Sequence, residues 1–157
     1  LFREQRVHKT YQAIAPYRPE LGFPREHHSR IQESGHFIRM HEVAGPPNSH
    51  TRLTLLEHNT HWARYQLEPI SGKRHQLRVH MAALGIGILG DGLYPEVNDA
   101  PEGDFSRPLR LLAQAIAFTD PLTQQQRHFH SQYTLGALPP EPAPSGQQTW
   151  QGLPANA

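Results

Sequence analysis

The chain has 157 residues, a formal net charge of +1 and no cysteine. Its length is that of one domain, and its near-neutral charge means that any polyanionic partner must be argued from local basic patches. The lack of cysteine excludes disulfides and thiolate metal sites, and no apolar run is long enough to span a bilayer.

The start of the sequence is charged. Residues 1–6 carry two arginines and a glutamate, with neither an initiator methionine nor the apolar run of a signal peptide. We therefore expect the first residue to be a cut through a longer protein. The cysteine-free composition suits a reducing compartment, and we expect a cytoplasmic location.

Alternating side chains predict a strand over residues 7–15, with Lys9 and Tyr11 on the same side. Proline, glycine and charge then break any periodicity, which predicts a loop over residues 16–28. A strand pair that turns near residues 34–35 is expected within residues 30–43.

The clearest β-hairpin follows. Residues 51–57 and 62–68 alternate well between apolar and polar side chains and are joined by the polar residues 58–61. One face of this hairpin should point into the core. Its members are Leu53, Leu55, Ala63, Tyr65 and Leu67.

A short amphipathic helix is predicted over residues 71–85. Ser71 is a candidate N-cap, Leu77, Met81 and Leu84 recur at helical spacing, and Gly85 stands where a helix would end. The helix should begin directly after the second hairpin strand, which places its N-terminus at one end of the sheet.

Positive charge concentrates at the start of this predicted helix. Lys73, Arg74 and Arg78 are followed by no acidic residue until Asp91, so the helix start should attract anions, although a solvated surface is the alternative interpretation. Arg78 stands beside Leu77 at the edge of the apolar stripe. A sheltered arginine there needs a carboxylate partner or a bound anion.

The C-terminal third is less regular. Residues 95–108 predict a surface loop, and the apolar residues 109–118 predict a strand that is covered on both faces. Residues 127–135 could form a last edge strand. The proline-rich residues 136–157 should be a disordered tail, which leaves residues 1–135 as the folded unit.

Two site patterns are rejected on their context. Residues 85–90 match the dinucleotide pattern G-x-G-x-x-G, but they follow a helix rather than a strand, which favours a tight glycine turn. His75 and His80 are five residues apart and point away from each other on a helix, while the 27–28 and 128–130 histidine pairs lie in weakly structured segments. No metal site is expected.

Residues 70–81, with residues 83–85, 88–91 and Tyr94, resemble the RluA-type pseudouridine synthase family, and so do residues 2–13. The resemblance extends from residue 1 to about residue 133. It implies an α+β fold with a mixed, mainly antiparallel sheet and flanking helices. It also implies an enzyme that isomerises uridine to pseudouridine in structured RNA, either rRNA or tRNA, as a monomer without metal or organic cofactor.

The resemblance also implies roles for individual residues. The family nucleophile is an aspartate in an H-R-L-D-type motif, Tyr11 matches the tyrosine that packs against the flipped base, and Arg78 matches the arginine that pairs with the nucleophile. Lys73, Arg74 and His75 would lie near the substrate phosphates, where an extruded nucleotide must be held.

The chain departs from the family pattern at the nucleophile. Its aspartates are Asp91, Asp99, Asp104 and Asp120, and none stands in the nucleophile motif, which the family places before residue 1. We therefore expect a fragment that is inactive alone and in which Asp91 has a structural role. The alternative is a non-catalytic RNA-binding relative. A further departure is Gln114, where the family commonly has histidine.

Overall fold

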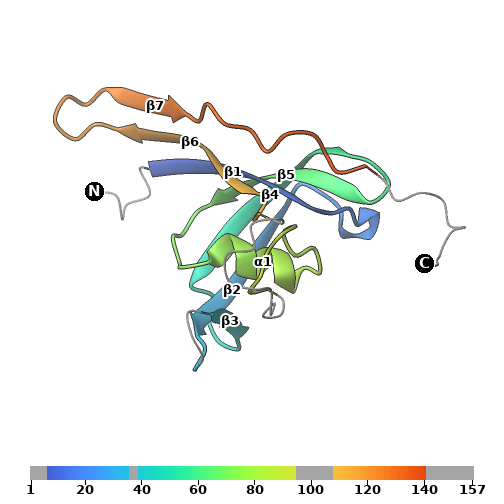
Figure 1. Cartoon of the computed structure of the whole chain (residues 1–157). Coiled ribbons are helices and arrows are strands. Elements are labelled where there is room, and N and C mark those ends of the chain that lie inside the picture. Colours follow the sequence, from blue (N-terminus) through green and yellow to red (C-terminus); the bar gives the residue numbers. More distant parts are fainter. Residues whose placement is uncertain (1–6, 36–38, 95–107, 141–157) are drawn as a thin grey trace, which may run out of the picture.

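The computed structural model describes residues 7–35, 39–94 and 108–140. These residues form a seven-stranded sheet in the order β3-β2-β4-β5-β1-β6-β7, with one α-helix packed against it (Figure 1). The elements are β1 (Val7–Pro16), the 3-10 turn η2 (Pro19–Leu21), β2 (Arg25–Glu33), β3 (Met40–Val43), β4 (Ser49–His58), β5 (Trp62–Pro69), α1 (Gln76–Ala83), β6 (Leu111–Thr119) and β7 (Gln126–His130). The α+β class is confirmed. The sheet is antiparallel at every pairing between these strands rather than mixed, and α1 is the single α-helix of the part described.

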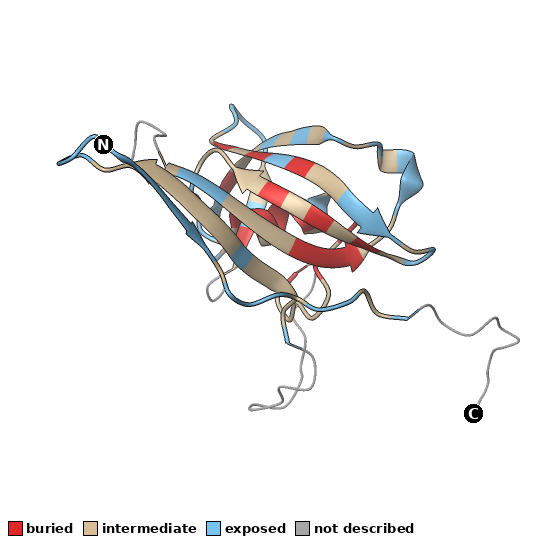
Figure 2. Ribbon diagram, turned by 90° about the horizontal axis from the view of Figure 1, so that it is seen from above, coloured by how far each residue is buried: buried red, intermediate tan, exposed pale blue. Residues whose placement is uncertain are grey.

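The predicted hairpin is strands β4 and β5, which pair with Leu53 opposite Leu67. The expected inward face is confirmed: Leu53, Ala63, Tyr65 and Leu67 are fully buried and Leu55 is partly buried. Leu77 and Met81 of α1 join the same core cluster, so the helix covers this face of the sheet. Figure 2 shows the buried positions gathered in the central strands.

The predicted loop over residues 16–28 is wrong at its end, because β2 begins at Arg25. Exposure alternates over the first residues of this polar strand, with Glu26 and His28 pointing to solvent and His27 turned toward the helix side. Pairing of β2 with both β3 and β4 supplies the hydrogen bonds that hold it extended. Long-range ladder formation thus overrides the turn-like composition.

The helix is shorter than predicted. It begins at Gln76, and His75 before it has the left-handed backbone conformation with φ of 56°. Ser71 does not cap it, because the Ser71 Oγ accepts a hydrogen bond from the His50 backbone N–H and donates to the Gln76 side chain. Lys73 and Arg74 consequently lie in the loop before the helix. The predicted end is confirmed, since the chain leaves the helix at Gly85 with φ of 81°.

Strand β6 is present but is not covered on both faces. Each of its residues is partly or fully exposed, and all of β7 is exposed. The reason is its place in the sheet, between β1 and β7, in a hairpin that extends away from α1 (Figure 1). The last strand is Gln126–His130 rather than residues 127–135.

The start of the predicted tail contacts the rest of the molecule. Arg64 donates to the Gly136 carbonyl, and Asn59 donates to the Pro139 carbonyl at 3.0 Å. Residues 141–157, and residues 95–107 of the predicted surface loop, lie outside the part described. No helix among the described residues is long and apolar enough to cross a membrane.

Candidate functional site

A pocket of about 340 Å³ opens between β1, the loop before α1 and the start of β6. Its lining includes four of the five residues singled out from the sequence: Tyr11, Lys73, His75 and Arg78. Arg74 is not among the lining residues. The volume falls in the range of small-molecule sites, roughly 300–1,000 Å³. The fold therefore brings together residues that are more than sixty positions apart in the chain.

Gln76 holds the loop that forms one wall of this pocket. Its Oε1 accepts hydrogen bonds from Ser71 Oγ at 2.7 Å and from the Lys73 backbone N–H at 3.1 Å. Its Nε2 donates to the His50 carbonyl and to Thr51 Oγ1, both at 2.9 Å. Gln76 is only 3% exposed. The sequence analysis missed this role, because a glutamine at a helix start carries no signal of its distant partners on β4.

Arg78 has a carboxylate partner within the chain. Its Nε and Nη2 donate to the Asp91 carboxylate at 3.0 and 2.7 Å, and the Asp91 side chain is fully buried. The expectation that the partner of Arg78 lies before residue 1 is thus incomplete. The Asp91 Oδ1 also accepts the backbone N–H groups of Leu93 and Tyr94. The expected structural role of Asp91 now has a defined geometry.

Tyr94 connects the elements behind this pair. Its hydroxyl accepts a hydrogen bond from the Met40 backbone N–H at 2.7 Å and lies 3.0 Å from His75 Nδ1. The guanidinium groups of Arg39 and Arg78 lie over its ring, at 5.1 and 5.4 Å from the centroid. Tyr94 belonged to the motif in the sequence, but only its buried contacts show that it positions both His75 and Arg78.

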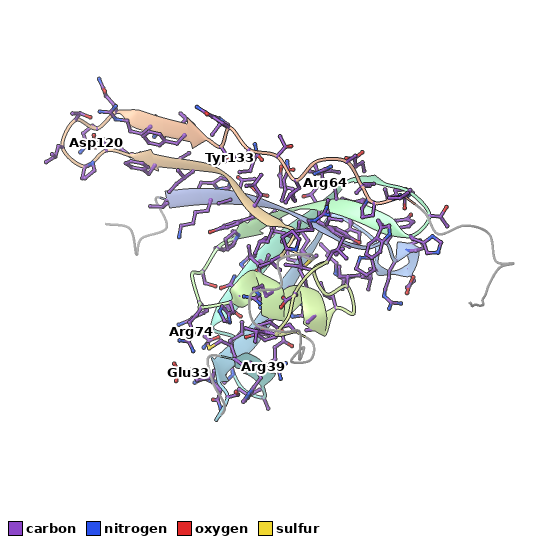
Figure 3. The ribbon with its side chains drawn as sticks, in the orientation of Figure 1. Glu33, Arg39, Arg64, Arg74, Asp120 and Tyr133 are labelled. Atoms are coloured by element: carbon purple, nitrogen blue, oxygen red, sulfur yellow. The ribbon has the colours of Figure 1, made fainter. Side chains whose placement is uncertain are left out.

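The charges around the pocket differ from the sequence expectation. Glu33 on β2 comes within 3.5 Å of Arg74, and both side chains are exposed at the same end of the molecule (Figure 3). Burial, followed by the nearby charges of Arg78 and Arg74, lowers the pKa of His75. His75 is therefore neutral at pH 7 and offers a hydrogen bond rather than a positive charge. Lys9 lines the pocket as well, on the side of β1 that the alternation assigned to Tyr11.

Tyr11 also borders a second groove of about 380 Å³ along β1, β6 and β7, which Lys9, Gln114 and His130 share. Gln114 lies at an irregularity of the ladder, since Thr10 pairs with Ala115 and Tyr11 with Ala113. Its backbone carbonyl accepts a hydrogen bond from the Ser131 N–H. The position where the family commonly has histidine thus lies beside Tyr11.

Solved structures share this fold. Human RNA Pseudouridylate Synthase Domain Containing 1 superposes with a TM-score of 0.66 and 25% identity, over 97% of this chain and 64% of that one. Human RNA Pseudouridylate Synthase Domain Containing 4 gives a TM-score of 0.62 at 22% identity, over 84% of this chain and 60% of the other, and supports the fold alone.

Proteins with similar sequences also carry the name of RNA pseudouridine or pseudouridylate synthases. The Dual-specificity RNA pseudouridine synthase RluA of Pasteurella multocida is 33% identical over 136 residues, covering 82% of this chain and 58% of the relative. The human RNA pseudouridylate synthase domain-containing protein 1 is 32% identical over 138 residues, covering 73% of this chain and 39% of the relative. This chain therefore spans less than two thirds of the length of either relative.

The family profile described as RNA pseudouridylate synthase matches residues 1–83, which is more than half of the chain. The chain belongs to this family, and within it to the RluA-type pseudouridine synthases. The matched range includes Tyr11, the loop residues Lys73 and Arg74, and Arg78. The pocket that these residues line is accordingly the candidate active site of an isomerase family.

Proposed function

We propose that this chain contributes to the conversion of uridine to pseudouridine in RNA, with rRNA or tRNA as the substrate. The observation that carries the proposal is the pocket in which Tyr11 and Arg78 meet the basic side chains of Lys9 and Lys73. An aromatic ring, a sheltered guanidinium and nearby cations suit a flipped nucleotide, because the ring can pack against its base while the cations bind its phosphates.

The residues divide the work by their chemistry. Tyr11 packs against the extruded base, and Lys73, Arg74 and Lys9 attract the phosphates that flank it. His75 is neutral at pH 7 and can exchange hydrogen bonds with the sugar or base without adding charge. No metal or organic cofactor is needed for these roles.

Arg78 can serve two carboxylates. Its guanidinium has five N–H donors, and Asp91 engages one on Nε and one on Nη2. Three donors remain on a side chain that is 18% exposed at the pocket wall. We propose that they orient the nucleophilic aspartate of the intact enzyme, while Asp91 holds the guanidinium in place.

We further propose that these 157 residues do not catalyse alone. Asp91 is buried and saturated with hydrogen bonds, and Asp120 lies in the turn of the β6–β7 hairpin, away from Arg74 (Figure 3). Asp99 and Asp104 lie outside the described residues. Turnover by the chain alone would contradict this part of the proposal.

Release of tritium from RNA labelled at the uracil C5 position tests the activity in the intact protein that carries this chain. Arg78→Ala and Tyr11→Phe should each lower the rate by about 100-fold, a typical loss for a group that acts on the reacting base. Arg127→Ala and Tyr133→Phe are the controls and should retain the wild-type rate, because neither residue lines the pocket: Arg127 pairs with Asp120, and the Tyr133 side chain is exposed. Full activity of both pocket variants would refute the proposal.

The second candidate is a non-catalytic RNA-binding protein. The bidentate pairing of Arg78 with Asp91 favours it, because the arginine already has a carboxylate partner. In that case RNA would bind with a salt-dependent affinity that Lys73→Ala weakens, while no tritium would be released by the intact protein. The monomeric state and the cytoplasmic location stay predictions.

A further inference from the structure

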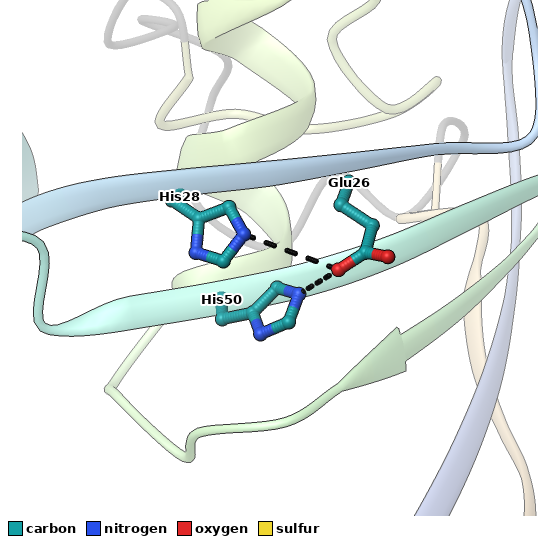
Figure 4. A group of neighbouring side chains, drawn as sticks. All are labelled: Glu26, His28 and His50. Atoms are coloured by element: carbon teal, nitrogen blue, oxygen red, sulfur yellow. Dashed lines mark hydrogen bonds and ion pairs between the residues drawn. The ribbon is translucent and has the colours of Figure 1, made fainter.

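Two histidines and a glutamate converge on the face of the sheet opposite α1. Glu26 and His28 are two residues apart on β2, so both point to the same side, and His50 of β4 is the direct cross-strand partner of His28. The side chains are 48%, 52% and 25% exposed, respectively. Figure 4 shows the two imidazoles directed at one carboxylate, with the helix behind the strands.

The ligand atoms are close enough to share one ion. His50 Nε2 hydrogen bonds to Glu26 Oε1, and His28 Nε2 lies 3.9 Å from the same oxygen. The three ligand atoms lie within 4.8 Å of one another. Zinc ligands lie about 2.0–2.2 Å from the metal, which separates neighbouring ligand atoms by roughly 3.4 Å. Small rotations of these accessible side chains complete the geometry.

The two imidazole rings stack, with centroids 3.9 Å apart and an angle of 22° between their planes. One hydrogen bond to Glu26 accounts for His50 but leaves the approach of His28 to the same oxygen at a non-bonded distance. A cation between the three groups satisfies both imidazoles and the carboxylate together. Two neutral imidazoles and one carboxylate form a ligand set that suits zinc, and three protein ligands leave a position open for water.

We propose that Glu26, His28 and His50 form a binding site for a divalent transition metal of the zinc type, which clamps β2 to β4. The sequence analysis expected no metal because it placed His28 in a loop, whereas the ladder between β2 and β4 sets it opposite His50. This site is on the other side of the sheet from the candidate active site. It is independent of the proposed RNA modification.

A second group of possible ligands, His27, Glu42 and His80, is less suited to metal. Both ring nitrogens of His80 already face hydroxyl groups: Nδ1 lies 2.8 Å from Thr51 Oγ1, and Nε2 lies 3.0 Å from Ser49 Oγ. His80 is fully buried and its ring cannot turn toward an ion without breaking these contacts. The exposed cluster is therefore the better site.

Arg52 limits the affinity of the proposed site. It is the cross-strand partner of Glu26 and lies on the same face, so its positive charge opposes a bound cation. Arg52→Gln should consequently tighten metal binding several-fold. A cluster that merely forms surface hydrogen bonds would not predict this direction.

The test is calorimetric titration of the purified chain with zinc ions alone, together with the visible absorption of bound cobalt. Wild type should bind one equivalent, and Glu26→Gln, His28→Ala and His50→Ala should each weaken it by about tenfold or more. His8→Ala is the matched control, since His8 forms an exposed cross-element pair with Glu68 at 2.8 Å that contains only one histidine. It should bind zinc as wild type does.

Three results would overturn the proposal: equal affinities of wild type and His28→Ala, equal losses in His8→Ala and His28→Ala, or loss on His27→Ala without loss on His28→Ala. Far-UV circular dichroism of each variant checks that the sheet is intact. Glu26→Gln keeps the size of the side chain at an exposed position, so its result remains interpretable even if a histidine variant unfolds.

Discussion

Arg78 and Asp91 form a two-pronged ion pair that joins α1 to the turn after it, with Nη2–Oδ1 and Nε–Oδ2 distances of 2.7 and 3.0 Å. Because the Asp91 side chain is fully buried, the pair is as much a part of the core as of the pocket. The pair ties the orientation of a proposed catalytic residue to the folding of the 90–94 turn.

Asp91→Asn should therefore destabilise the protein by about 3 kcal/mol, since breaking a buried pair leaves one charge uncompensated. Urea denaturation measures the loss. The control is Arg127→Gln, which removes a surface ion pair with Asp120 at 3.4 Å and should change the stability far less. Equal losses of stability in the two variants would show that the buried Arg78–Asp91 pair stabilises the fold no more than a surface ion pair does.

Gln76→Ala should open the loop that precedes α1. The substitution removes the acceptor of the Lys73 N–H and of the Ser71 hydroxyl, at a cost of about 2 kcal/mol. The affinity of this variant for RNA, measured by fluorescence anisotropy, should also fall, because Lys73 is no longer held at the pocket. Gln32→Ala replaces an exposed glutamine on β2 and should change neither quantity; unchanged RNA binding by Gln76→Ala would contradict the assigned role.

The stability of the fold should depend on the protonation of His80. Burial, followed by the charges of His27, His28 and His50, lowers the pKa of His80 from 6.5 to about 3. Between these values the unfolded chain binds one more proton at this residue, so stability decreases as pH falls below 6.5, by about 1.4 kcal/mol per pH unit. Above pH 6.5 the effect vanishes.

Denaturation midpoints of wild type and His80→Gln between pH 7.5 and 5 measure this contribution as a difference in slope. His128→Gln, at an exposed position of β7, is the control and should keep the wild-type slope. Parallel profiles for wild type and His80→Gln would refute the assignment.

Gly90→Ala should destabilise the fold by more than about 2 kcal/mol. The backbone of Gly90 has φ of 84°, and an added Cβ would collide with the Pro108 carbonyl, whose carbon would lie only 2.7 Å away. Gly35→Ala has open space around the new methyl group and should change stability by less than about 0.5 kcal/mol. Thermal unfolding compares the two, and a wild-type midpoint for Gly90→Ala would show that the turn can rearrange.

Local patterns predicted much of this fold. The β4–β5 hairpin followed from alternation alone, because one face of each strand is buried and the turn between them is short. The α+β class followed from the family motif. The same motif named Tyr11, Lys73, His75 and Arg78, which the fold brings to one pocket, whereas the place of Lys9 in its lining was not predicted.

The structure differs from the sequence predictions where contacts between distant residues decide the local conformation. The N-terminus of α1 is set by the bonds of Gln76 to β4, which no helix signal near Ser71 reveals. The strand character of residues 25–28 comes from pairing with β4. The apolar run of β6 resembles a fully covered strand, but coverage is decided by position in the sheet, which composition does not encode.

The adjacent histidines of β2 impose a limit on how the chain can change its length. His27 faces the helix side of the sheet and His28 faces the opposite side. The buried Ile31 lies on the same side as His27. Loss of one residue within β2 would exchange these faces, moving each imidazole to the wrong surface and turning Ile31 toward water. Insertions and deletions should therefore be absent from residues 25–33 among functional variants.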